Sequence, residues 1–178
     1  MLPKRISRKV IYENPWMNLY TDRVEFPGGR IVDEHHIIDL KNDSVGVILE
    51  NDQQYILFVH AYRYVTGTIE WEIPAGVIDN DEDVIDAAIR EVFEESGYTA
   101  KNAYELHSFF PMNGITDHRY HIVYATPYGE NTTYDRNEIE GLRWISQDEI
   151  NSMLREGIIK DGLTITAILL HQRLKLIS

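Results

Sequence analysis

The pattern of apolar and polar positions separates a strand-rich beginning of the chain from a longer part in which strands and helices are interleaved. Residues 19–26 alternate between apolar and polar, residues 30–38 have the pattern of a returning strand, and the Pro-Gly-Gly at 27–29 is a strong turn signal. Together with the short apolar run at 9–12, these stretches predict a small antiparallel sheet. Because so small a sheet buries little surface alone, we expect it to pack on the rest of the chain or, preferably, on a second subunit.

From residue 42 onward, short apolar runs alternate with helical patterns. Strands are expected at residues 45–49, 55–62, 70–73, 102–110, 118–125 and 142–145. Helices are expected at residues 83–96, from about 147 behind Ser146, and at 164–176. Residues 74–76 (Pro-Ala-Gly) are interpreted as the turn into the first helix.

This interleaving predicts an α/β fold in which helices sandwich a mixed sheet. We therefore expect an amino-terminal antiparallel sheet region at residues 1–41, followed by a second domain at residues 42–178.

Composition and charge narrow the function classes. The chain has 178 residues, 43% of them hydrophobic, which suits one ordinary domain with or without a small appendage. It has no cysteine, which excludes disulfides and thiol catalysis and fits a cytoplasmic protein. The net charge of −12 argues against a nucleic-acid partner, and no apolar run is long enough to predict a membrane span or a secretory signal.

The predicted helix at 83–96 gathers acidic residues on one side. At about 100° per residue, Glu91 and Glu95 lie about 40° apart and Glu94 lies about 60° from Glu91. Like charges at this spacing destabilise a helix by a few tenths of a kcal/mol each, so a compensating group is expected. A divalent cation with oxygen ligands is a natural candidate, whereas the plainer interpretation is a solvated acidic helix that ends at Gly97.

The same stretch resembles the signature of the Nudix family, G-x5-E-x7-R-E-U-x-E-E-x-G-U, in which U is a bulky aliphatic residue. The fixed positions fall on Gly76, Glu82, Arg90, Glu91, Val92, Glu94, Glu95, Gly97 and Tyr98. Only Tyr98, which is aromatic instead of aliphatic, departs from the pattern. The resemblance implies a Nudix-type α/β/α sandwich and a hydrolase that breaks a phosphoanhydride bond.

The resemblance also implies a metal site of Mg²⁺ or Mn²⁺. It makes Glu91 and Glu95 direct ligands, Glu94 a direct or water-mediated ligand, and the carbonyl of Ala75 a further ligand. Arg90 is implied to hold the glutamates in place, which makes it part of the catalytic group with Glu94 and Glu95. Such carboxylates suit Mg²⁺, which keeps several waters and takes its other ligands from the phosphates of a substrate.

Upstream of the helix, Tyr62-Arg63 and the run Trp-Glu-Ile-Pro-Ala-Gly at 71–76 are similar to the ADP-ribose pyrophosphatase branch. By that resemblance Arg63 contacts substrate phosphate, for which its planar, permanently charged group is suited; the alternative is a surface ion pair. Glu72 either contacts the nucleoside or pairs with a neighbour.

The loop at 111–118 departs from that branch, which typically reads P-S-P-G-x-S-x-E here. Asn113 replaces the second proline and precedes Gly114, and both are candidate substrate contacts. His118 stands where the branch has its glutamate base, with Asp117 beside it. Either side chain is a candidate base; Asp117 is preferred as a carboxylate, and His118 has an ordinary pKa near neutrality.

The sequence therefore predicts a metal-dependent hydrolase of a nucleoside diphosphate sugar, with ADP-ribose, cleaved to AMP and ribose 5-phosphate, as the first candidate. The alternatives are another sugar nucleotide such as GDP-mannose, a dinucleotide, or a non-catalytic Nudix-fold nucleotide sensor. The amino-terminal sheet is expected to form a homodimer.

Overall fold

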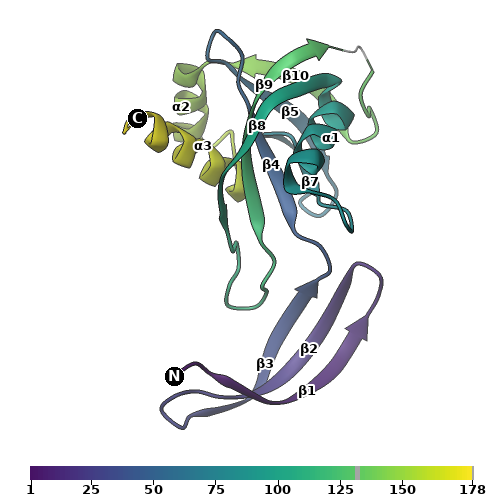
Figure 1. The fold of residues 1–178 in the computed structure, drawn as a ribbon, viewed down its shortest axis with the longest axis vertical. Coiled ribbons are helices and arrows are strands. Elements are labelled where there is room, and N and C mark those ends of the chain that lie inside the picture. The colour runs from purple at the N-terminus through teal and green to yellow at the C-terminus, as the bar shows by residue number, and fades with distance from the viewer. Residues whose placement is uncertain (131–132, 178) are drawn as a thin grey trace. The chain divides into compact units, whose positions relative to one another are not determined.

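The chain forms two compact units in the computed structural model, which describes residues 1–130 and 133–177 (Figure 1). The first unit comprises residues 1–43 and takes in residues 110–119 from later in the chain. The second comprises residues 44–109 and the chain from residue 120 onward. The predicted boundary after residue 41 stays a prediction, but the loop at 110–119 belongs with the amino-terminal sheet.

The first unit is a three-stranded antiparallel meander in the order β1-β2-β3. Its strands are β1 (Lys4–Glu13), β2 (Met17–Glu25) and β3 (Ile31–Leu40). β2 and β3 are the predicted hairpin, extended at its open end, whereas β1 is much longer than the apolar run at 9–12 suggested. The loop at 110–119 is joined to this sheet where the amide of Ile38 donates to the carbonyl of Ile115 at 2.7 Å.

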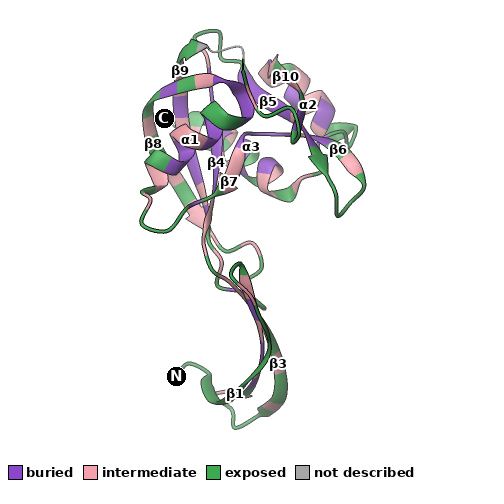
Figure 2. Ribbon diagram, turned by 90° about the vertical axis from the view of Figure 1, so that its right-hand side faces the viewer, coloured by how far each residue is buried: buried purple, intermediate pink, exposed green. Residues whose placement is uncertain are grey.

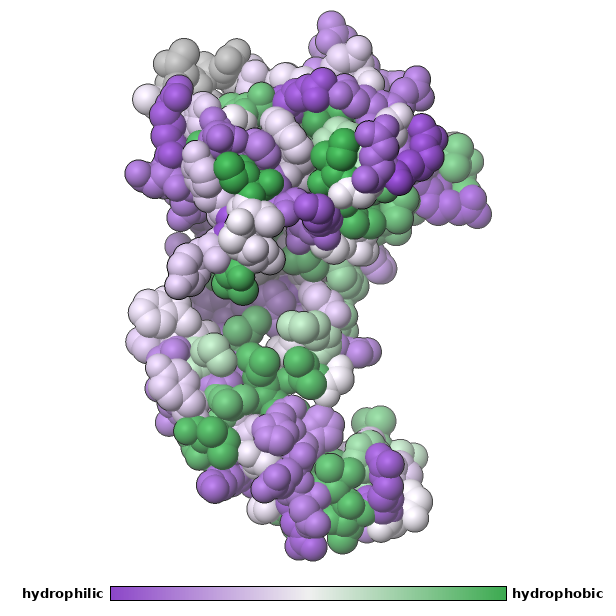
Figure 3. Space-filling view, turned by 180° about the vertical axis from the view of Figure 1, so that it is seen from behind, coloured by the Kyte–Doolittle hydropathy of each residue, from purple (hydrophilic) through white to green (hydrophobic). Residues whose placement is uncertain are grey.

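One face of this sheet carries a polar cluster in which the β2 residues Asp22 and Tyr20 are buried and the β1 residue Arg8 is exposed. Arg8 donates to both carboxylate oxygens of Asp22 at 2.7 and 2.8 Å, and its guanidinium lies over the ring of Tyr20. This pairing lowers the pKa of Asp22. By contrast, β1 is exposed along its whole length (Figure 2), and apolar side chains stand among polar ones on the surface of this unit (Figure 3). The exposed large hydrophobic residues of β1 are Ile6, Val10, Ile11 and Tyr12, each about half exposed.

In the residues that the structure describes, the second unit holds two sheets and three helices. The antiparallel sheet has the order β10-β5-β6, and the mixed sheet has the order β7-β4-β9-β8, with β4 and β9 parallel. The strands are β4 (Ser44–Leu49), β5 (Ile56–Arg63), β6 (Thr68–Glu72), β7 (Ala75–Val77), β8 (Tyr98–Phe109), β9 (Tyr120–Glu130) and β10 (Ile139–Ile145). The helices are α1 (Val84–Ser96), α2 (Gln147–Arg155) and α3 (Gly162–Lys175).

Side chains that alternate along the central strands belong to two hydrophobic clusters, one on each face of the sheets. Val45 and Val47 of β4 pack with Ala88 and Val92 of α1, whereas Ile48 packs with residues of α2 and α3. Figure 2 shows the buried residues gathered on these central strands. The arrangement confirms the predicted α/β/α sandwich, with its strands divided between two sheets.

One local prediction was wrong. Ala75 and Gly76 do not form a simple turn, because residues 75–77 are the edge strand β7, paired with β4. Pro74 removes a backbone donor just before it, and a strand of three residues leaves too little alternation to detect.

Helix α1 begins and ends where the sequence predicts. The side chain of Asp83 accepts from the amide of Ile85, and Gly97 closes the helix with φ of 73°, a left-handed conformation that glycine adopts without steric cost.

Among the residues that the structure describes, no helix is both long and apolar enough to cross a membrane.

Candidate active site

Arg90 is the centre of an ion-pair network on the acidic side of α1. Its guanidinium donates to Glu82 at 2.8 and 2.9 Å, to Glu91 at 2.6 Å and to Glu94 at 3.0 Å. It also donates to the carbonyl of Val77 on β7, which ties the helix to the edge strand. These carboxylates hold the pKa of Arg90 above its ordinary value, with Glu82 the strongest contributor. Arg90 therefore offsets much of the repulsion that the acidic spacing creates.

Glu95 lies apart from this network, at the free edge of β7. It is 8% exposed, and one of its carboxylate oxygens accepts from the amide of Ala75 at 3.0 Å. Burial is the largest cause that raises its pKa, to about 8, although the hydrogen bond from Ala75 opposes the shift. Glu95 is thus a buried carboxylate with too little positive charge around it, an arrangement that costs free energy unless a cation relieves it.

Gly76 makes room for the carboxylate of Glu91. A methyl group on Gly76 would lie 2.1 Å from the carboxylate carbon and from one oxygen, and 2.3 Å from the other. Glu91 is itself 8% exposed, and burial is the main cause that raises its pKa. The glycine predicted to open the motif therefore lets a buried carboxylate lie directly against the backbone of β7.

The helix carboxylates face a cleft of about 610 Å³. Its lining residues are Glu91, Phe93, Glu94, Glu95, Thr133, Tyr134, Asp135 and Glu138. The rest of its lining comes from the segment before β10, which is joined to α1 where the amide of Asp135 donates to the carbonyl of Glu94 at 3.0 Å. Most side chains that line this cleft carry carboxylate or hydroxyl oxygens, and hard divalent cations take such oxygens as ligands.

The carboxylate oxygens of this cleft are suitable ligands for a divalent cation, but they are not positioned as a complete coordination site. Glu91 and Glu94 turn toward Arg90, and no three acidic or histidine side chains within residues 1–130 and 133–177 converge as a metal cluster. A cation in this cleft therefore has to compete with Arg90 for these two carboxylates, whereas Glu95 has no arginine partner in the structure. The predicted ligand roles of Ala75, Glu91, Glu94 and Glu95 stay predictions.

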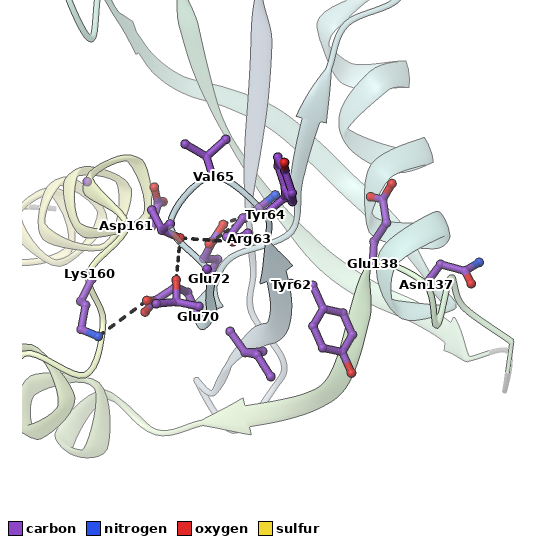
Figure 4. A pocket seen from close by; sticks show the side chains of 15 residues that line it. Tyr62, Arg63, Tyr64, Val65, Glu70, Glu72, Asn137, Glu138, Lys160 and Asp161 are labelled. Atoms are coloured by element: carbon purple, nitrogen blue, oxygen red, sulfur yellow. Dashed lines mark hydrogen bonds and ion pairs between the residues drawn. The ribbon is translucent and has the colours of Figure 1, made fainter.

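A second, larger cavity of about 1180 Å³ lies between the β5–β6 hairpin and the start of α3, and we call it the Arg63 pocket. Figure 4 shows its side chains, with Arg63 and Glu72 directed toward one another. Arg63 donates to the two carboxylate oxygens of Glu72 at 2.9 and 2.5 Å, and this pairing raises the pKa of the guanidinium. Glu72 is 6% exposed. Of the two open interpretations of Glu72, the structure shows the pairing with a neighbour.

The rim of the Arg63 pocket is aromatic and its walls are mainly acidic. Tyr62 and Tyr64 are exposed at its edge, and Tyr64 is 98% exposed. Lys160 pairs with Glu70 at 3.6 Å (Figure 4), and Asp161 caps α3 by accepting from the amide of Thr164 at 2.7 Å. Aromatic rings can stack on a base, and paired carboxylates can accept from sugar hydroxyls, so the pocket has the chemistry to hold a nucleotide or a sugar.

The predicted loop residues Asn113, Gly114, Asp117 and His118 belong to the first unit, not to the unit that holds α1. Asn113, Gly114 and Asp117 line a cavity of about 400 Å³ with Arg8 and His35 of the sheet. The ring of His118 lies 3.0 Å from the carbonyl of Asn42 and 4.0 Å from Asp43. Their roles as substrate contacts and base stay predictions.

Sequence reasoning missed one acidic residue, Glu138. It lines both the cleft of α1 and the Arg63 pocket, and its carbonyl accepts from the amide of Tyr62 at 2.9 Å. Glu138 lies more than forty residues after the helix carboxylates, so no local spacing could connect them. The available signal was its position immediately before a strand in an otherwise polar segment, which is too common to be specific.

Comparison with known proteins identifies the family. The model of the NUDIX domain matches residues 40–164, and the model of the nucleoside diphosphate sugar hydrolase N-terminal domain matches residues 3–38. The chain belongs to the Nudix family. The predicted resemblance is thereby confirmed, and the protein is a pyrophosphohydrolase of a family whose members generally use a divalent metal ion.

Individual relatives agree with this assignment. A CMP-5'-(N-acetyl-N-hydroxy-3-aminopropyl)phosphonate hydrolase of Streptomyces rubellomurinus is 32% identical over 85% of this chain and 73% of its own length. An ADP-ribose pyrophosphatase of Bacillus subtilis is 26% identical over 93% of this chain and 90% of its own. The crystal structure of an ADP compounds hydrolase has the same fold, with a TM-score of 0.83 and 19% identity, over 97% of this chain and 94% of that one.

Proposed function

We propose that this protein is a Mg²⁺- or Mn²⁺-dependent Nudix hydrolase that cleaves the diphosphate of a nucleoside diphosphate sugar, with ADP-ribose as the first candidate substrate. One observation carries the proposal: Glu138 joins the acidic cleft of α1 to the Arg63 pocket. A ligand that spans the two can present a diphosphate to the carboxylates and its nucleoside or sugar to the pocket.

The helix carboxylates are the proposed metal ligands. Glu91 and Glu95, with Glu94 and the carbonyl of Ala75, would hold the cation beside β7. When bound, such a cation supplies charge neutralisation for the diphosphate and makes water a better nucleophile. Arg90 keeps the glutamates close together while the cation is absent, since it already bridges Glu91 and Glu94.

Residues from two segments of the chain are candidates for the general base. The sequence favours Asp117 or His118, the residues where the ADP-ribose branch has its glutamate. Glu138 is the second candidate, because its side chain lines the same cleft as the proposed ligands. Replacing each by its neutral analogue, Asp117→Asn, His118→Gln and Glu138→Gln, separates them: the base is the residue whose replacement lowers the rate and removes the acidic limb of its pH dependence, where protonation of the base slows the wild type.

The substrate is tested by a panel with product identification. ADP-ribose, GDP-mannose, a dinucleotide such as diadenosine diphosphate, and a CMP-linked phosphonate are each incubated with the protein and either Mg²⁺ or Mn²⁺, and the products are identified by mass. The CMP-linked compound is included because a relative named for such a substrate is 32% identical to this chain. We expect ADP-ribose to yield AMP and ribose 5-phosphate. If ligands bind but none of the four is hydrolysed with either metal, the protein acts as a nucleotide sensor and the proposal fails.

A further inference from the structure

Glu72, the last residue of β6, holds one edge of the Arg63 guanidinium. It is 6% exposed, and its two oxygens accept from Nε and Nη2 of Arg63 at 2.9 and 2.5 Å. A guanidinium has five N–H donors in a rigid plane, so this contact leaves two donors on Nη1 and one on Nη2. The outer N–H groups of Nη1 and Nη2 form a second fork that fits two oxygens of a phosphate. Arg63 can therefore bind a phosphate while it stays paired with Glu72.

The register of the β5–β6 hairpin shows that the pairing turns Arg63 back along the hairpin, away from its tip. Arg63 lies opposite Thr68, whereas Glu72 lies four residues further along β6 on the same face. Glu70 lies between these two positions, also on that face, but it pairs with Lys160 at 3.6 Å. The long side chain of Arg63 therefore passes a nearer carboxylate and ends at the more distant one.

This end of β5 lies beside the acidic cleft of α1. The amide of Tyr62 donates to the carbonyl of Glu138 at 2.9 Å, and Glu138 lines both the cleft and the Arg63 pocket. The side chain of Arg63 is 43% exposed, so its second fork is open to a ligand. Hydrogen bonding to Glu72 is the first cause that raises the pKa of Arg63, and the charge of Glu95 in the cleft raises it further.

Stability alone does not explain a buried carboxylate at position 72. Removing two charged groups from water costs about as much as their attraction returns, so a buried pair adds little to stability compared with apolar residues of the same size. An arginine side chain, however, loses much rotamer freedom when it is fixed in one orientation. Glu72 fixes Arg63 before a ligand arrives, and a group that is ordered in advance binds its ligand more tightly.

We propose that Glu72 is a positioning residue for phosphate binding: it holds the Nε–Nη2 edge of Arg63 so that the Nη1–Nη2 fork receives a phosphate of the substrate. Glu72 touches neither the phosphate nor the reacting atoms, and it stays paired with Arg63 in the free and the bound protein. The inference rests on the proposed phosphate-binding role of Arg63 in a Nudix hydrolase.

The test compares Glu72→Gln with Glu50→Gln. Both variants neutralise a buried carboxylate that is paired with cationic side chains, but Glu50 pairs with His171 and Lys175, outside the Arg63 pocket. The KM and kcat for ADP-ribose are measured with Mg²⁺, and the Kd for ADP-ribose is measured by calorimetry without metal. Loss of a negative charge beside an anionic ligand should by itself tighten binding, whereas loss of positioning should weaken it.

The sign of the change therefore decides the role of Glu72. We expect Glu72→Gln to raise KM and Kd about 10-fold and to change kcat less than 3-fold, because positioning acts on the bound substrate and the transition state alike. Glu50→Gln should change KM and Kd less than 2-fold. If Glu72→Gln does not fold, Glu72→Asp replaces it: aspartate keeps the charge but is one carbon shorter, and it should raise Kd at least 3-fold.

A double-mutant cycle with Arg63→Ala tests the route of the effect. If Glu72 acts through Arg63, Glu72→Gln no longer raises the Kd in the Arg63→Ala background. A Kd that Glu72→Gln leaves unchanged or lowers, or an equal rise in both backgrounds, would overturn the inference. Weaker Mn²⁺ binding by Glu72→Gln without substrate would make Glu72 a metal ligand and overturn it as well.

Failure of the proposed function has a different result. A wild-type protein that binds ADP-ribose but hydrolyses no member of the panel refutes the proposed activity, and the calorimetric cycle still tests Glu72. A wild-type protein that does not bind ADP-ribose removes Arg63 as a phosphate contact, and the inference falls with it.

Discussion

Replacing Gly76 by alanine should separate the stability of the protein from its activity. The φ of Gly76 is not in the left-handed region, so an alanine backbone is allowed and only space is at issue. The new methyl group would lie 2.1 Å from the carboxylate of Glu91, which is the far end of a flexible side chain. We therefore expect that carboxylate to rotate away while the strand stays in place.

The cost in stability is small by this reasoning. Rotation loses the 2.6 Å hydrogen bond from Arg90 to Glu91, a net loss of about 0.5–1.5 kcal/mol. Alanine in place of glycine restricts the unfolded chain and returns about 0.4–1 kcal/mol. The free energy of unfolding, measured in urea, should therefore change by less than about 1 kcal/mol.

The cost in activity is large, because Glu91 is a proposed metal ligand. We expect kcat/KM to fall about 100-fold, equivalent to about 2.7 kcal/mol, and Mn²⁺ binding measured without substrate to weaken about 10- to 100-fold. Gly141→Ala is the matched control, since a methyl group at Gly141 meets nothing within 4 Å. If Gly76→Ala keeps wild-type Mn²⁺ affinity, Glu91 is not a ligand and the reasoning is wrong.

Three further predictions concern other parts of the molecule. Burial alone would raise the pKa of Glu50, but hydrogen bonds and charge from His171 and Lys175 outweigh burial and lower this pKa from 4.5 to about 2. The free energy of unfolding of the wild type should therefore exceed that of Glu50→Gln by up to about 3 kcal/mol near pH 7. This difference is fully present above pH 4.5 and is lost as the pH falls toward 2. If the difference in unfolding free energy between the two proteins stays constant from pH 7 to 3, the prediction is wrong. Arg63→Lys should raise KM for ADP-ribose about 10-fold or more, because a lysine cannot reproduce the two-pronged contact; an unchanged KM would make Arg63 a structural partner of Glu72 only. The exposed apolar residues of β1 should be covered in a homodimer, so light scattering at micromolar concentration should give twice the chain mass, and a monomer would refute this.

Much of the fold could be predicted because local signals agreed with one another. Helix α1 combines an aspartate cap, an apolar stripe and a closing glycine, and it lies within one residue of its predicted bounds. The hairpin of β2 and β3 was visible because alternation flanks a strong turn signal. Strand β7 was not, because its three residues carry no period, and its existence depends on pairing with β4.

The candidate site was predictable only where its residues are close in sequence. The helix glutamates and Arg90 share one motif, so their proximity follows from the helical period. Glu138 reaches the site because β10, which follows it, pairs with β5, and such pairing links residues far apart in the chain. The pairing of Arg63 with Glu72 follows from the β5–β6 hairpin, whose register could not be fixed from the sequence alone.

The carboxylates of α1 are proposed to hold the divalent cation needed to cleave a diphosphate. The most direct measurement is the rate of ADP-ribose hydrolysis by the wild type and by Glu95→Gln as Mg²⁺ is titrated from zero. We expect a wild-type rate that requires Mg²⁺ and a rate for Glu95→Gln that is lower by at least about 100-fold at saturating metal. Equal rates for the two proteins, or a wild-type rate that persists in a chelator, would contradict it.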